Sequence, residues 1–141
     1  MATFLFKTEP TVFSYADLVR EGTATWDGVS NAAALQALRT ARRGDEVLIY
    51  HTGRERAIVG LARVLGSPYE DPAQPGRTPT GAPKFAVVDL APVRAAKTPV
   101  TLDAIKADAR FKQLALVRQS RLSVMTVPAE MDKALRSMAG L

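Results

Sequence analysis

The sequence predicts one α+β domain in which about five to six short strands curl into a partial barrel flanked by helices. Three strand-like segments follow one another between residues 46 and 93, which favours antiparallel pairing over the regular strand–helix alternation of a doubly wound sheet. Helix signals stand before and after them. Hydrophobic residues make up 47% of the 141 residues, enough for one sizeable core.

The expected strands and helices can be placed in order along the chain. Strands are indicated by short apolar runs, in several of which apolar side chains alternate. They are expected at residues 3–7, 23–27, 46–52, 57–65, 85–93 and 122–127. Helix starts are indicated by capping side chains or by a proline suited to the first turn. They are expected at Ser14, Asn31, Thr101 and Pro128, and the second helix is expected to reach about residue 42.

A Pro- and Gly-rich segment at residues 66–84 is the one break in composition. It holds five prolines and three glycines without periodicity, which predicts a long exposed loop. Neither the residues before this segment nor the residues after it contain enough strands and helices to fold as a separate domain. We therefore interpret the segment as an insertion within a single domain spanning residues 1–141, and we expect a monomer.

The chain is basic. Lys and Arg number 19 against 14 Asp and Glu, giving a net charge of +5. Cations near backbone phosphates release counterions, so this balance favours a nucleic-acid partner. No apolar run approaches the ~18 residues of a membrane helix, and the N-terminus does not resemble a signal peptide. We expect a soluble, cytoplasmic protein without a membrane partner, and the absence of cysteine fits a reducing compartment.

The residue patterns of common enzyme and cofactor sites are missing. There is no phosphate loop, dinucleotide fingerprint or converging carboxylate pair. His51 is the sole histidine and there is no cysteine, so a metal site would lack ligands. The sequence therefore predicts no metal and no cofactor, and it favours a binding module over an enzyme.

Four motif segments lie in order along nearly the whole chain. They are Phe4-Leu-Phe-Lys-Thr-Glu-Pro10, Trp26-Asp-Gly-Val-Ser-Asn31, Val47-Leu-Ile-Tyr-His-Thr52 and Leu116-Val-Arg-Gln-Ser-Arg-Leu-Ser-Val124. Together they resemble the EVE domain, a member of the PUA-like superfamily. The resemblance implies a PUA-like pseudobarrel of mixed and antiparallel strands flanked by helices. It also implies a pocket for a modified base, methylated or hydroxymethylated, turned out of DNA or RNA, and no catalytic residues.

The sequence departs from the usual EVE pattern beside its tryptophan. After Trp26-Asp-Gly-Val the family usually has Arg-Asn-Tyr, whereas Ser30, Asn31 and Ala32 stand here. Phe85 stands where the family usually has Trp. These departures leave the fold expectation unchanged and bear on the identity of the ligand.

The predicted base site centres on Trp26, the one tryptophan. Its ring is expected to stack on the base, a contact worth ~1–3 kcal/mol, and a buried core role is the alternative. Asn31, Ser14 or main-chain groups are expected to read the polar edge of the base, although Asn31 and Ser14 also suit helix caps. Glu9 is expected to accept a hydrogen bond from an exocyclic amine.

Cationic and polar side chains are expected around this base site. Lys7 and Arg118 would hold the flanking phosphates. The alternative for Lys7 is a surface ion pair with Glu9, and the alternative for Arg118 is a solvated loop. Further binding residues are expected in the polar cluster of Arg118 and at the end of the third strand. They are Gln119, Ser120, Tyr50 and His51.

Two other functions remain open at this stage. A small hydrolase acting on a modified nucleoside or amide, as in ASCH-type relatives, would have Lys7, Glu9 and Tyr50 as its acid–base set. An adaptor would capture a protein partner through residues 72–83 of the Pro-rich segment.

Overall fold

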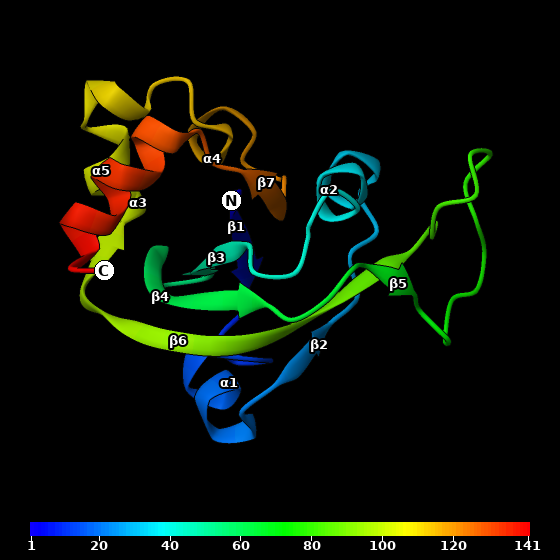
Figure 1. The fold of residues 1–141 in the computed structure, drawn as a ribbon. Helices are drawn as coiled ribbons and strands as arrows, with labels where there is room; N and C mark the ends of the chain where they lie inside the picture. Colours follow the sequence, from blue (N-terminus) through cyan, green and yellow to red (C-terminus); the bar gives the residue numbers. More distant parts are fainter.

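The computed structural model describes residues 1–141 and shows one curled sheet with helices packed against it (Figure 1). The strands are β1 (Thr3–Thr8), β2 (Ala24–Trp26), β3 (Glu46–His51), β4 (Ala57–Val64), β5 (Tyr69–Glu70), β6 (Ala86–Thr101) and β7 (Val124–Thr126). The helices are α1 (Tyr15–Glu21), α2 (Ala32–Leu38), α3 (Leu102–Lys106), α4 (Ala115–Arg118) and α5 (Ala129–Ala139), with a short 3-10 helix η1 (Ala109–Phe111).

The sheet combines one parallel pair with antiparallel neighbours. Its order is β2-β6-β4-β3-β1-β7, and β5 pairs with β6 outside this path. β1 and β3 are parallel, with Thr3 opposite Glu46 and Thr8 opposite His51. β6 is 16 residues long and pairs with β2, β4 and β5, so it crosses the breadth of the molecule in Figure 1. The predicted α+β fold with a curled sheet is confirmed, with seven strands.

Successive side chains of the strands enter two hydrophobic cores. In β1, Phe4 and Phe6 join the core that includes residues of α1 and α2, whereas Leu5 joins the core that includes residues of α3, α4 and α5. This alternation follows from the two-residue repeat of a strand. Because helices cover both faces of the sheet, a ligand can reach the sheet only at the ends of the strands and at the loops that follow them.

α1 is fixed against the sheet by a tyrosine and a glycine. The Tyr15 hydroxyl donates to the Leu61 carbonyl over 2.7 Å. A Cβ at Gly60 would collide with the Tyr15 ring, so β4 needs glycine there. Ser14 caps the helix: its hydroxyl accepts from the Asp17 N–H over 3.0 Å, and its own N–H donates to the Asp17 carboxylate. The predicted cap at Ser14 is confirmed.

Some predicted boundaries were wrong. α2 ends at Leu38 and not near residue 42, because Thr40 and Ala41 form tighter i→i−3 bonds and the Asp45 carboxylate accepts from the Arg42 N–H to start the turn into β3. Residues 66–84, predicted as a long exposed loop, are mostly loop with no buried residue, and they contain the unpredicted two-residue strand β5. They form an arm that extends from the body in Figure 1, where Arg39, the residue after α2, donates a hydrogen bond to the Lys84 carbonyl.

The C-terminal region also differs from the expected elements. η1 and α4 were not predicted, because three- and four-residue helices have no periodicity to detect. No helix has both the length and the apolar character needed to cross a bilayer.

Candidate nucleic-acid interface

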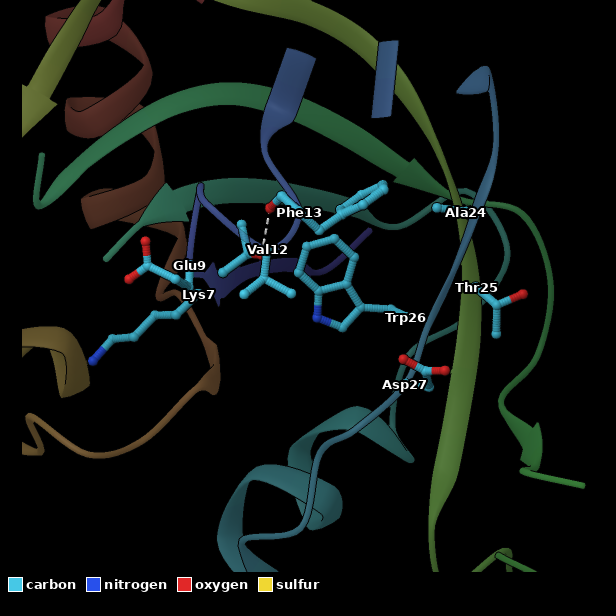
Figure 2. A pocket seen from close by; sticks show the side chains of 9 residues that line it. Lys7, Glu9, Val12, Phe13, Ala24, Thr25, Trp26 and Asp27 are labelled. Atoms are coloured by element: carbon cyan, nitrogen blue, oxygen red, sulfur yellow. Dashed lines mark hydrogen bonds between the residues drawn. The ribbon is translucent and has the colours of Figure 1, made fainter. Parts of the chain in front are cut away.

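A cavity of about 460 Å³ opens beside Trp26, where the end of β1, the loop after it and β2 meet (Figure 2). Its walls are both apolar and charged. The lining residues are Lys7, Thr8, Glu9, Val12, Phe13, Ala24, Thr25, Trp26 and Asp27. This volume lies within the range of about 300–1,000 Å³ that small-molecule sites occupy.

One wall of the cavity is the tight turn that follows β1. The N–H groups of Val12 and Phe13 both donate to the Glu9 carbonyl over 2.9 Å. The Thr8 hydroxyl donates to the Phe13 carbonyl over 2.6 Å, the dashed bond in Figure 2. The turn places Phe13 against the core and leaves Val12 80% exposed at the mouth of the cavity. The turn therefore holds the exposed apolar side chain of Val12 in a fixed position at the mouth of the cavity.

The opposite wall is β2, which holds Trp26 across from Val88 of β6. The indole packs on Phe6 at a centroid distance of 5.7 Å and meets Phe13 edge-to-face at 6.1 Å. Only 8% of Trp26 is exposed. Gly28 then adopts a φ of 76°, which turns the chain out of the strand towards α2. Trp26 is thus a core residue and a wall of the cavity at once.

Lys7 is the cation of this cavity and is held by a distant segment. Its Nζ donates to the Ser120 carbonyl over 2.9 Å and lies 5.8 Å from the centre of the Tyr50 ring. Burial lowers the pKa of the Lys7 ammonium group below its ordinary value. The ammonium has three donors, so two remain for a ligand.

Two carboxylates supply the negative charge of the cavity. Glu9 accepts long hydrogen bonds from Thr11 and from the Thr52 hydroxyl, at 3.2–3.3 Å. It makes no ion pair with Lys7, so the surface ion pair considered for these two residues does not form. Asp27 makes neither a hydrogen bond nor an ion pair. Both carboxylates can accept from a bound donor such as an amine.

A second hollow of about 320 Å³ lies beside α4 and the loop that follows it. Its lining is polar and carries two arginines. The lining residues are Asn31, Ala33, Arg118, Gln119, Ser120, Arg121 and Leu122. Because Ser120 lines this hollow and accepts the Lys7 bond, Lys7 joins the two hollows. Arg118 donates to the Gln113 side chain from one of its terminal nitrogens, and Arg121 makes no bond within the chain.

The structure divides the predicted site residues into three groups. Lys7, Glu9 and Trp26 line the first cavity, and four others line the second hollow. Those four are Asn31, Arg118, Gln119 and Ser120. Asn31 caps α2 through its side-chain oxygen, which accepts from the Ala34 N–H over 3.0 Å, so its amide NH₂ is still available to a ligand.

The third group, Ser14, Tyr50 and His51, lines neither hollow. The Ser14 hydroxyl is used in the α1 cap, and Tyr50 is buried in the second core. His51 Nε2 accepts from the Tyr15 N–H over 3.0 Å, which puts the ring proton on Nδ1, 3.2 Å from the Glu55 carboxylate. These three side chains hold the scaffold, and the expectation that they read or border the base is not supported by their positions.

Several cavity residues were not predicted from the sequence. Thr8, Val12, Phe13, Thr25 and Asp27 line the cavity because the turn after β1 folds towards β2. The nearest signal was the position of Asp27 directly after Trp26. The turn itself gives no signal of which strand it will face.

The candidate acid–base set of the hydrolase alternative is not assembled. Lys7 contacts the face of the Tyr50 ring, and burial raises the pKa of the Tyr50 hydroxyl. Glu9 bonds to threonines and lies in no pair with either residue. No cluster of three or more His, Asp or Glu side chains is arranged as a metal site.

The family model of the EVE domain matches residues 2–138. The chain belongs to the EVE domain family. The resemblance found in the sequence motifs is thereby confirmed. Thymocyte nuclear protein 1 of Rattus norvegicus is 31% identical over 137 residues, which cover 84% of this chain and 61% of that protein. This EVE chain therefore spans less than two thirds of the length of the curated relatives it matches.

Solved structures of high similarity show the same fold. A protein of Rhodopseudomonas palustris solved by NMR superposes with a TM-score of 0.88 at 39% identity, covering 99% of this EVE chain and 94% of its own. The human THYN1 protein, crystallised in complex with 5-methylcytosine-containing DNA, superposes with a TM-score of 0.89 at 26% identity, covering 100% and 99%. An ASCH protein of Zymomonas mobilis shares the fold alone, with a TM-score of 0.59 at 12% identity.

Proposed function

We propose that this EVE domain binds DNA carrying a modified cytosine, and that the flipped base enters the Trp26 cavity. The observation that carries the proposal is the cavity itself: an opening of about 460 Å³ with an aromatic wall, two carboxylates and one ammonium group. The human THYN1 protein in complex with 5-methylcytosine-containing DNA, which superposes over the whole chain, supports the choice of DNA and of base.

Entry of the base requires that it leave its stack, at a cost of a few kcal/mol. The cavity offers compensating contacts. An exocyclic amine can donate to Asp27 or Glu9, and base carbonyls can accept from Lys7. Phe13, Val12 and the Trp26 ring provide apolar surface for a methyl group, a contact worth ~1–3 kcal/mol.

The second hollow would bind the phosphates beside the flipped nucleotide. Arg118 and Arg121 carry positive charge there, and Ser120 and the Asn31 amide can donate to phosphate oxygens. Lys7 stands between base and phosphate because it belongs to the cavity and bonds to a residue of the hollow. The overall charge of +5 favours the same contacts.

We further propose that the domain reads the base without chemical change. The candidate acid–base side chains Lys7, Glu9 and Tyr50 form no hydrogen bond to one another. Lys7 lies over the face of the Tyr50 ring and Glu9 bonds to threonines, so no proton path joins them. A reader needs only that binding of the modified base be tighter than binding of the normal base.

Fluorescence anisotropy with matched duplexes tests the proposal. One labelled duplex carries a single central 5-methylcytosine, a second carries cytosine there, and a third arm is RNA with the same sequence and methyl group. We expect the methylated DNA to bind about tenfold or more tightly than the unmodified DNA, the value of one methyl in an apolar pocket. Equal affinities of the two DNAs would contradict base reading, and tighter binding of the RNA would contradict the choice of DNA.

A further inference from the structure

Trp26 is too deeply packed to offer a free ring face. Phe6 and Phe13 pack against the indole, and the residue is only 8% exposed. A ring that stacks on a base must show most of one face to the ligand. With 8% of its surface exposed, Trp26 cannot show a whole ring face to a ligand.

The indole N–H belongs to the exposed part of Trp26. No atom of the chain accepts a hydrogen bond from the Trp26 nitrogen, although the residue is more than nine-tenths buried. Every fully buried side-chain nitrogen and oxygen has a partner, so the indole nitrogen must be reachable from the cavity. Figure 2 shows the nitrogen on the ring edge that points away from Phe13, with Lys7 to one side and Asp27 to the other.

An indole N–H without a partner in the chain is unusual in so buried a residue. Indole N–H groups of mostly buried residues usually have an acceptor within the protein, whereas this one is reachable from the cavity. Of the two carboxylates that line the cavity, Asp27 makes no bond, and Glu9 accepts only long bonds from threonines. The cavity therefore presents one fixed donor and two carboxylates that can accept from a ligand.

We propose that Trp26 recognises the flipped base through its indole N–H, as an in-plane hydrogen-bond donor, and not through stacking. This inference rests on the proposed function and specifies how the cavity reads the base. The base lies with its edge towards the indole, and the N–H bonds to a carbonyl oxygen or an unprotonated ring nitrogen. The matching edge has such an acceptor beside an exocyclic amine that can donate to Asp27, as cytosine does with N3 and its 4-amino group.

The lone tryptophan allows a substitution of one atom. Growth on β-(3-benzothienyl)alanine replaces Trp by an analogue with sulfur in place of the N–H, and it changes position 26 alone because the chain has one tryptophan. We expect affinity for the 5-methylcytosine duplex to fall about tenfold, the effect of a hydrogen bond lost from a buried site. The midpoint of thermal unfolding should not change, since the N–H has no partner in the fold. Affinity for the unmodified duplex should not change either, because that duplex is expected to bind through phosphate contacts with its base still stacked.

Trp26→Phe gives a second variant that keeps an aromatic ring and removes the donor. It should show the same loss of discrimination between the two duplexes, whereas a stacking residue would tolerate the exchange. Retention of wild-type affinity for the methylated duplex by both variants overturns the N–H role.

The single indole resonance distinguishes the two contact types directly. On addition of the methylated duplex to ¹⁵N-labelled protein, a hydrogen bond moves the indole proton downfield, whereas stacking on a base moves it upfield by ring current. A downfield shift supports the proposal and an upfield shift overturns it. If the wild-type chain binds neither duplex, the proposed function fails together with this inference. If the wild-type chain binds the methylated duplex and loss of the N–H does not weaken that binding, only the inference fails.

Discussion

The two hollows of this EVE domain differ in almost every physical property although they share a boundary at Lys7 and Ser120. The Trp26 cavity is bounded by the buried Trp26 and the half-buried Phe13, and it carries two carboxylates. The hollow beside α4 is lined by exposed polar side chains and two arginines. The first suits a planar heterocycle with polar edges, and the second suits a phosphate. The difference separates two components of binding: discrimination in the cavity and charge-driven affinity in the hollow.

The largest effect is expected from Lys7, because this residue belongs to both components. Lys7→Met keeps the apolar stem and removes the ammonium, and we expect affinity for both duplexes to fall, with the larger loss, about 10- to 100-fold, for the methylated one, the value of a charged hydrogen bond. Anisotropy measures both. Lys133→Met on α5, which removes the same charge from an exposed position, is the control. A loss confined to the methylated duplex would assign Lys7 to the cavity only, and an equal loss for both duplexes would assign it to the second hollow only.

Asp27 tests the cavity by itself. Its carboxylate has no partner in the fold, so Asp27→Asn should leave stability unchanged. We expect the ratio of affinities for methylated and unmodified duplexes to fall about tenfold, because the base amine loses a charged acceptor. Asp103→Asn, at an exposed position in α3, is the matched control. An unchanged ratio would remove Asp27 from the reading edge.

Arg121 tests the hollow by itself. Arg121→Ala should weaken both duplexes equally, about three- to tenfold at low salt, and reduce the slope of log affinity against log salt by about 0.9. Titrations at several salt concentrations measure the slope. A change in the ratio between the two duplexes would show that the hollow also reads the base.

The pH dependence of binding should follow Lys7. Burial lowers the pKa of this ammonium in the free protein, and a phosphate nearby raises it in the complex. Affinity is therefore expected to fall as pH rises through the lowered pKa of Lys7 in the free protein. Lys7→Arg keeps its charge throughout and should abolish the decline. A decline that persists in this variant would assign the titration to another group.

Ser14 should have the smallest effect on binding. Ser14→Ala removes the capping box of α1 and should cost about 1 kcal/mol in the free energy of unfolding. Chemical denaturation measures this cost. Affinity for both duplexes should be unchanged, because Ser14 lines neither hollow. Weaker binding by the folded variant would restore Ser14 to the base site.

The sequence predicted the scaffold better than it predicted the site. β1 and β3 followed from local apolar patterns, and the α1 cap followed from Ser14 and Asp17, since these signals act within a few residues. The cavity depends on contacts between distant segments. The bond from Lys7 to Ser120 spans 113 positions, and no local pattern specifies it.

The site prediction was limited further because one side chain can suit two different roles. A serine or asparagine oxygen that suits a base edge also suits a helix cap, and the structure shows both Ser14 and Asn31 as caps. Only the position of Asn31 in the second hollow keeps a second role open for its NH₂ group. The burial of Tyr50 and His51 likewise depends on helices and loops that pack over β3 from elsewhere in the chain.

Intrinsic emission from Trp26 tests the division between cavity and hollow most directly, because no other tryptophan contributes. We expect the methylated duplex to change this emission in step with the anisotropy of the bound DNA. The unmodified duplex should bind at low salt through phosphate contacts and leave the emission unchanged. The same emission change with both duplexes, or none with the methylated one, would contradict the placement of the base beside Trp26.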